Sequence, residues 1–228
     1  MAAVSSAICE TPCVHVIIAR KGKQGGSEFQ FLLQRRSAVA NPDPSSWSFP
    51  GEILAGSDVA SLTASDGRGE QNKVAKLYPF AEKCVVDELG KKPTGFNLSR
   101  VHHLFMTGSK PFTNGQQPCF LYLIDDQMDV EFIRSPPRAR EPRRPQIDEA
   151  QTAVAGEFPN TRWGYAWVDT NEITRELSEG TKPFARWARD LLTNQMDLVL
   201  HELTVIANHR TAQKMAAPPG SGGEAFGG

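Results

Sequence analysis

The sequence has no run of apolar residues long enough to cross a membrane, which takes about 18 consecutive residues. Its N-terminus lacks a basic region followed by an apolar segment, and no arginine precedes the first expected strand at residues 13–19. We therefore expect neither a secretory signal nor a cleavable mitochondrial presequence. The expected location is intracellular, cytoplasmic by default, with a mitochondrial location through an internal or unusual signal as the alternative.

Cysteine is scarce, and neither sign of charge dominates. Cys9, Cys13, Cys84 and Cys119 show no paired spacing typical of a zinc site, so a reducing compartment is the simpler interpretation. The chain carries 25 Lys+Arg against 26 Asp+Glu. This balance argues against a generally basic nucleic-acid-binding surface, although it leaves room for a local basic patch.

What the sequence does contain is a series of short β-rich runs separated by glycine and proline. These runs predict strands at 13–19, 28–35, 47–49, 100–107, 118–125 and 163–168. An apolar stripe of helical period predicts one long helix over 182–209. We divide the chain into an irregular lead-in (1–12), one domain (13–195), a helix extension (196–210) and a flexible tail (211–228). Within the domain, residues 59–79 are expected to form an exposed loop, and residues 134–147 an Arg/Pro-rich loop.

The most informative stretch joins the segment WSFPG at Trp47–Gly51 to the expected helix AEKCVVDELG. On that helix Cys84, Asp87 and Glu88 are three and four residues apart, so they share one face. Apolar residues four apart on the neighbouring face can anchor the helix on a core. A helix with two acids on one edge and an apolar stripe on another can present carboxylates to a divalent cation.

This stretch resembles the Nudix box, G-x5-E-x7-R-E-U-x-E-E-x-G-U, which a W-x-F-P-G segment precedes. Gly51 matches the turn, whereas Glu52 stands where the box begins with Gly and Asp58 where it has its first Glu. Lys83 replaces the arginine of the box. Residues 59–82 separate Asp58 from Lys83, which is 24 residues where the family has seven.

The paired acids of the box fall on Asp87 and Glu88, and the preceding box Glu falls on Cys84. The resemblance implies an α+β fold, a Nudix-type α/β/α sandwich with a mixed central sheet, here followed by a long C-terminal helix. It also implies Mg²⁺ or Mn²⁺ held by Asp87 and Glu88, aided by Asp58 or Glu52. Cys84 is the serious departure, because a thiol is a soft ligand that suits Mg²⁺ poorly.

The resemblance further implies residues that meet substrate. Asp87 and Glu88 would be catalytic through the metal, and Asp148 or Glu149 on a late loop would help to activate water. Arg35 and Arg36 follow a strand and could contact phosphate. His102 and His103 are adjacent on an expected strand, so at most one could serve a given site, and each is more readily interpreted as structural.

Two functions from different classes remain. The first is a metal-dependent hydrolase that cleaves a pyrophosphate bond in a nucleoside diphosphate-linked substrate. The alternative is a catalytically inactive Nudix-like structural or interaction subunit, as in a mitochondrial ribosome or an RNA-processing assembly. Residues 134–145 could contact RNA or an acidic partner. Residues 184–206 could bind a protein partner or self-associate, because their apolar face continues beyond the expected domain.

Overall fold

The computed structural model describes residues 13–22, 27–36, 38–39, 43–58, 70–89, 101–104, 118–124, 158, 161 and 164–216. Seven strands form one sheet: β1 (Cys13–Lys21), β2 (Phe29–Arg35), β3 (Trp47–Ser48), β4 (Gly51–Ile53), β5 (Val101–Leu104), β6 (Cys119–Leu123) and β7 (Tyr165–Asp169). Each predicted strand corresponds to one of these, and the sequence did not distinguish β4 as a separate strand. The β-branched and aromatic residues of β1, β2 and β6 explain why these three runs are extended and buried.

The sheet is mixed, as the resemblance implied. Its order is β3-β2-β1-β6-β5, with β4 paired to β1 and β7 paired to β2. β1 and β6 are parallel, and the other pairs are antiparallel. Because β1 pairs with β6 along one part of its length and with β4 at its start, the start of β1 lies beside the Pro-Gly bend.

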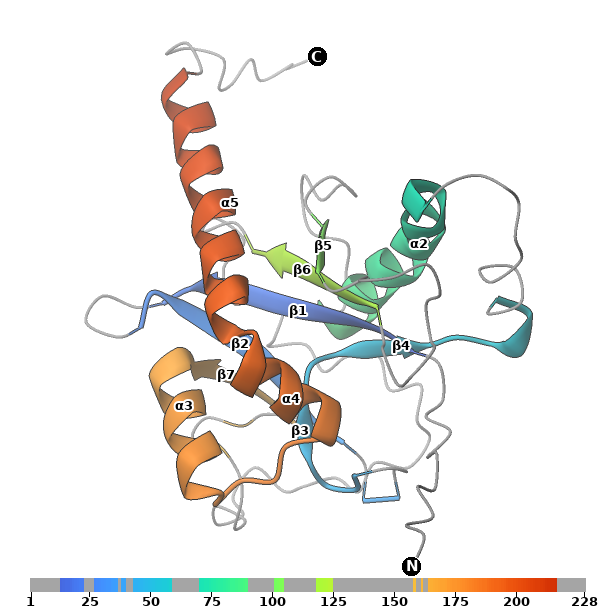
Figure 1. Ribbon diagram of the computed structural model, residues 1–228, viewed down its shortest axis with the longest axis vertical. Coiled ribbons are helices and arrows are strands. Elements are labelled where there is room, and N and C mark those ends of the chain that lie inside the picture. Colours follow the sequence, from blue (N-terminus) through green and yellow to red (C-terminus); the bar gives the residue numbers. More distant parts are fainter. Residues whose placement is uncertain are drawn as a thin grey trace, which may run out of the picture.

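Helices cover both faces of the sheet (Figure 1). They are α2 (Glu70–Leu89), α3 (Thr170–Glu179), α4 (Arg186–Asn194) and α5 (Met196–Ala216). Alternate residues of β1 contribute to two separate cores, since successive side chains of a strand point to opposite faces. One core packs against α2, and the other packs against α3, α4 and α5. The predicted α+β sandwich with a long C-terminal helix is confirmed.

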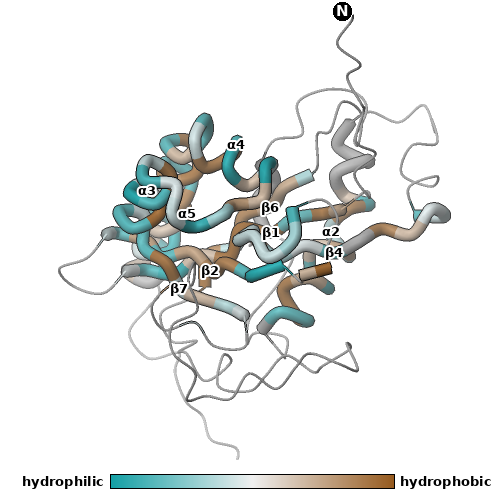
Figure 2. Tube along the Cα trace, turned by 90° about the horizontal axis from the view of Figure 1, so that it is seen from below, coloured by the Kyte–Doolittle hydropathy of each residue, from teal (hydrophilic) through white to brown (hydrophobic). Residues whose placement is uncertain are grey.

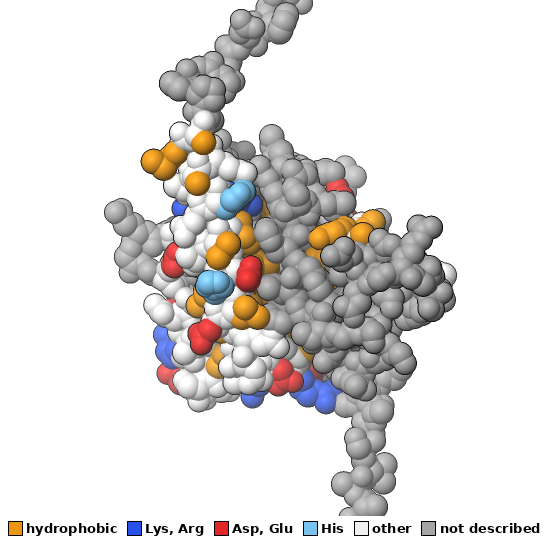
Figure 3. All heavy atoms as spheres, turned by 45° about the horizontal axis from the view of Figure 1, so that its top comes forward, with side chains coloured by type: hydrophobic (Ala, Val, Ile, Leu, Met, Phe, Trp, Pro, Cys, Tyr) orange, Lys and Arg blue, Asp and Glu red, His pale blue; other side chains and the backbone are white. Residues whose placement is uncertain are grey.

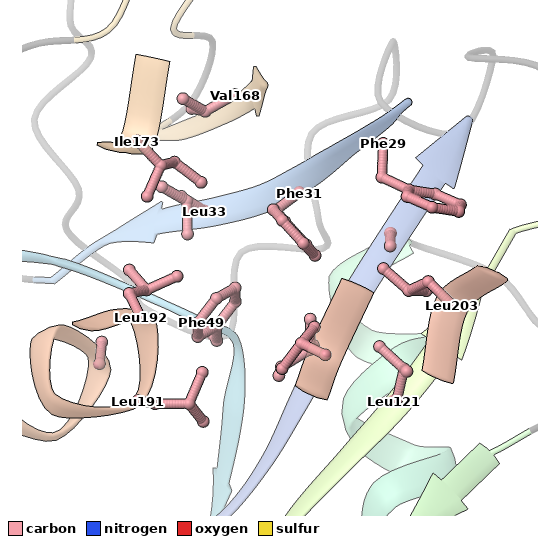
Figure 4. Packing of buried hydrophobic residues seen from close by; sticks show 14 of the residues in the cluster. Phe29, Phe31, Leu33, Phe49, Leu121, Val168, Ile173, Leu191, Leu192 and Leu203 are labelled. Carbon is pink, nitrogen blue, oxygen red and sulfur yellow. The ribbon is translucent and has the colours of Figure 1, made fainter. Parts of the chain in front are cut away.

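The larger core lies between the sheet and the C-terminal helices (Figure 4). Phe29, Phe31 and Leu33 enter it from β2, and Leu192 and Leu203 enter it from α4 and α5. Hydrophobic residues concentrate along the strands, whereas hydrophilic residues are prominent on α3 and α4 (Figure 2). In the described part of the chain, no helix combines the length and apolar character needed to cross a membrane.

The prediction of one helix over 182–209 is wrong. The chain leaves helical geometry at Gln195, where φ is −135°, and this separates α4 from α5. α5 then continues to Ala216, so the first part of the expected flexible tail is helical. The domain division near residue 195 stays a prediction.

The second half of the expected loop at 59–79 is also helical. α2 begins at Glu70, and Leu77 is completely buried in the core beneath this helix. Pro79 lies inside α2 with its ring exposed, and a proline at such a position removes one backbone donor. The segment VAKLYPF, in the second part of the expected loop, therefore packs on the domain at Leu77 and does so as helix.

α3 begins after the strand β7. Asp169 is its N-cap, and its Oδ1 accepts from the Glu172 amide at 2.9 Å. Gly180 closes the helix with φ of +68°, a left-handed conformation that glycine adopts without strain.

Candidate functional site

The Pro-Gly bend holds β4 tightly against the start of β1. A Cβ atom on Gly51 would lie 2.6 Å from His15 Nδ1 and 2.8 Å from Cys13 Sγ. Both approaches are far shorter than van der Waals contact, so only glycine fits here. The Pro50 carbonyl accepts from the Val16 amide at 2.9 Å, which fixes the bend to β1. The Trp-x-Phe-Pro-Gly segment therefore has a steric role that the structure accounts for.

Glu52, the residue after this bend, is joined to α2 by an ion pair. Glu52 projects from β4, and its carboxylate Oε1 contacts Lys83 Nζ. The same Lys83 ammonium lies 3.7 Å from Asp87 Oδ2, one helical turn further along α2. One lysine thus stands between two of the carboxylates that the resemblance assigned to a metal.

Lys83 and Asp58 keep the charge signs of the box arginine and first glutamate, so the resemblance implies that these two residues pair. Asp58 instead closes its own turn, where Oδ2 accepts from the Ala55 amide at 3.1 Å. The ion pair that joins α2 to the bend therefore involves Glu52, one residue after the bend. In the sequence, the signal for this ion pair is that Glu52 replaces a glycine of the box while Lys83 replaces its arginine.

Cys84 occupies the position of a box glutamate, but it belongs to the core. Its side chain is buried together with Leu77, Ala81 and Val85 on the apolar face of α2. Burial and, after it, the carboxylate of Glu88 raise the pKa of the Cys84 thiol well above its ordinary value. The thiol therefore stays protonated at neutral pH and supplies no anionic ligand.

The acids of the box can be tested against the needs of a divalent cation. Mg²⁺ and Mn²⁺ prefer several converging oxygen ligands. Among the residues that the structure describes, no three His, Cys, Asp or Glu side chains come together as a ligand group. Glu52 and Asp87 share the Lys83 ammonium, and Glu88 has its Oε2 atom buried. The described residues do not fit the metal that the resemblance implied.

A second cluster lies on the opposite face of the sheet, behind the bend. His15 stacks on Trp187 of α4, with ring centroids 3.7 Å apart. Burial and, after it, the charge of Arg36 lower the pKa of His15 to about 3, although hydrogen bonds with the Phe49 and Pro50 backbone act in the opposite direction. His15 is accordingly neutral over the physiological range and does not serve as a proton carrier there.

The sequence did not single out His15 or Trp187. His15 interrupts the apolar pattern of the first strand, which is the one feature of the sequence that marks it. That feature does not indicate Trp187 as its partner. Arg36 was expected to contact phosphate. Its Nε atom is buried, and its backbone amide donates to the Ser46 carbonyl at 2.8 Å. Contacts of Arg35 and Arg36 with phosphate stay predictions.

Several predicted site residues cannot be placed. Asp148, Glu149 and the loop 134–147 lie outside the described residues, as do the side chains of His102 and His103 on β5. Their suggested roles stay predictions. The structure brings together Glu52, Lys83 and Asp87, and it places Glu88 beside Cys84.

No protein-family model and no curated protein sequence matches this chain. Solved structures do match, and several of these neighbours are named as Nudix proteins or domains. A mutT/nudix family protein from Listeria innocua is 13% identical over 86% of this chain and 98% of its own, with a TM-score of 0.45. The NUDIX domain of Shewanella oneidensis NrtR, complexed with ADP ribose, is 12% identical over 82% and 86%, with a TM-score of 0.41.

A third neighbour is the T. brucei MERS1 protein in complex with RNA. It is 17% identical over 75% of this chain and 55% of its own, with a TM-score of 0.41. At such identities and TM-scores, these likenesses identify no activity and no ligand for this chain.

Proposed function

We propose that this chain is a Nudix-like domain that does not hydrolyse pyrophosphates and acts as a structural or interaction subunit of a larger assembly. The observation that carries the proposal is the position of the Lys83 ammonium between Glu52 and Asp87. By the resemblance, a hydrolase of this type would use Asp87 to hold a cation and its diphosphate ligand, with Glu52 as a possible aid. Here an internal cation already engages both.

Electrostatics explains why this arrangement opposes metal binding. Two like unit charges about 4 Å apart repel by about 4 kcal/mol at an effective dielectric constant of about 20, and a divalent ion doubles that. Lys83 is 41% exposed, so solvent screening reduces the figure. Even a reduced repulsion adds to the loss of one ligand at Cys84, which is buried and protonated. The Lys83 ammonium and the replacement of a box glutamate by Cys84 both disfavour metal binding.

The first test is a hydrolysis assay on nucleoside diphosphate-linked compounds with Mg²⁺ or Mn²⁺, using the wild-type chain and Glu88→Gln. We expect no turnover above background in either protein. Turnover that Glu88→Gln abolishes would refute the proposal in favour of a hydrolase. Turnover that survives this substitution unchanged would indicate a contaminant or a different site.

The second test removes the internal cation. Lys83→Met removes the ammonium that contacts Glu52 and Asp87, and we expect Mn²⁺ affinity, measured by titration calorimetry, to rise by about tenfold or more. Lys76→Met is the matched control, because it removes an exposed lysine from the same helix and should leave the affinity unchanged. Tight Mn²⁺ binding by the wild-type chain, unaffected by Lys83→Met, would contradict our reasoning.

A metal-dependent Nudix hydrolase is the second candidate. It is favoured by the location of Asp87 and Glu88 on the helix that Lys83 and Glu52 tie to the bend. In that case Asp148 or Glu149 would be the candidates for activating water. The hydrolysis assay separates this candidate from the first.

A further inference from the structure

α5 has two distinct faces. Its inner face packs on the sheet and on α4 through Val199, Leu203, Ile206 and Ala207, all of which are buried. The helix rises out of the body of the domain, and its last turns extend past the sheet (Figure 1). The buried residues of the inner face thus explain how α5 packs on the domain. They do not explain why the outer face of α5 carries apolar residues.

The outer face carries a regular stripe, which we call the α5 seam. Its members alternate three and four residues apart, which is the spacing of a coiled-coil interface, and every one of them is exposed. They are Leu198, His201, Val205, Asn208, Ala212 and Met215. The three largest apolar side chains, Leu198, Val205 and Met215, are 46%, 49% and 83% exposed. Figure 3 shows hydrophobic side chains and two histidines along this helix.

We propose that the α5 seam is the interface of a homodimer, in which α5 of a second copy packs against it in antiparallel orientation. Charge selects both the occupant and its direction. Glu202 and His209 flank the seam on the same edge of the helix, seven residues apart. In an antiparallel pair, each Glu202 lies across from the partner's His209, so the two-fold axis generates this contact twice.

A parallel pair would be less favourable. It would bring Asp197, on the other edge of the seam, across from the partner's Glu202, so that like charges would meet twice. The histidine of the antiparallel pair can donate an N–H to the carboxylate in either protonation state. The antiparallel register also places Leu198 against the partner's Met215, and Val205 against the partner's Asn208.

The length of the helix suits such a pairing. Eighteen residues from Leu198 to Met215 span about 27 Å, which is enough for six layers of side chains. The two domain bodies then lie at opposite ends of the helix pair. His201 and Asn208 are polar members of the seam, and polar seam residues fix register while lowering affinity. We therefore expect a reversible dimer that dissociates on dilution.

The test is sedimentation equilibrium of the full chain over a wide concentration range. The wild-type chain should dimerise, and Val205→Asp should weaken the dimer by about tenfold or more, because it buries a carboxylate in the seam. Gln213→Asp is the matched control, since it adds the same charge to an exposed position of α5 outside the seam. Both substituted residues are exposed, so far-UV circular dichroism should show unchanged folding.

A charge exchange tests the orientation. His209→Glu places two carboxylates opposite each other twice and should weaken the dimer by about fivefold. Adding Glu202→Lys to His209→Glu should restore the affinity. In a parallel pair, the carboxylate introduced by His209→Glu would face the partner's Thr204 instead. His209→Glu would then not weaken the dimer by charge repulsion, and adding Glu202→Lys would not restore its affinity.

A chain that stays monomeric at every concentration, or a dimer that Val205→Asp leaves intact, would overturn the proposal. Failure of the double variant to recover would overturn the antiparallel orientation. None of these experiments measures hydrolysis or metal binding. The dimer proposal can therefore be refuted without refuting the proposed function, and the reverse also holds.

Discussion

Replacing Gly51 with alanine tests how closely β4 is held against β1. The added methyl group would lie 2.6 Å from His15 Nδ1 and 2.8 Å from Cys13 Sγ. His15 cannot move aside easily, because it is buried and stacked on Trp187. Inserting a methyl group into a packed interior costs about 1–3 kcal/mol. A short contact with the constrained His15 ring and another with the Cys13 sulfur place Gly51→Ala near the upper end of that range, at about 3 kcal/mol.

The assay is urea unfolding followed by circular dichroism, with the free energy of unfolding taken from the midpoint and slope. In a chain of this size, a loss of about 3 kcal/mol also lowers the melting temperature by about 6–12 °C. Gly56→Ala is the matched control, because nothing lies within 4 Å of its added Cβ. If Gly51→Ala stays within about 0.5 kcal/mol of wild type, or Gly56→Ala costs as much, our account of the bend is refuted.

Two further predictions concern proton binding and helix capping. The pKa of His15 is lowered from 6.5 to about 3, so the unfolded chain binds a proton that the folded chain does not in this range. The free energy of unfolding should therefore fall as the pH drops from about 6.5 towards 3, by up to about 4 kcal/mol. His15→Phe keeps the ring against Trp187 and should flatten this dependence, whereas an unchanged slope would show that another group is responsible. Asp169→Ala removes the side-chain acceptor of the Glu172 amide and should lower the free energy of unfolding by about 1 kcal/mol, whereas Asp169→Asn should restore most of it. Equal losses in both variants, measured by urea unfolding, would argue against capping.

The strands could be predicted because local signals suffice for them. The β-branched run of β1 and the glycine-rich sequence before β2 mark extended segments without reference to the rest of the chain. The helical character of Asp87 and Glu88 follows in the same way from apolar spacing. These elements also carried the resemblance to the Nudix box, so the sandwich was predictable.

The break at Gln195 could not be predicted from periodicity. The apolar stripe continues across it, and residues of both α4 and α5 belong to one core, so the pattern carries no sign of the change in φ at Gln195. The helical start of α2 was missed for a related reason. Its polar first turn has the composition of a loop, and burial of Leu77 against the sheet is a tertiary effect.

The pairing within the candidate site could not be predicted. The resemblance drew attention to Glu52, Asp58 and Asp87 as acids near a metal and to Lys83 as the replacement of the box arginine. The sequence could not tell which acid Lys83 would contact, because that depends on the path of the 24 residues between Asp58 and Lys83. His15 and Trp187 are far apart in the chain and meet only through the fold.

The ammonium of Lys83 differs from a bound ion in one further respect. It is covalently attached to the helix whose acidic edge it faces, so its presence there does not depend on the concentration of any solute. A domain with a tethered counter-charge has that charge in place as soon as it folds. Chelators and changes in metal supply, which would empty an exchangeable site, leave this contact as it is.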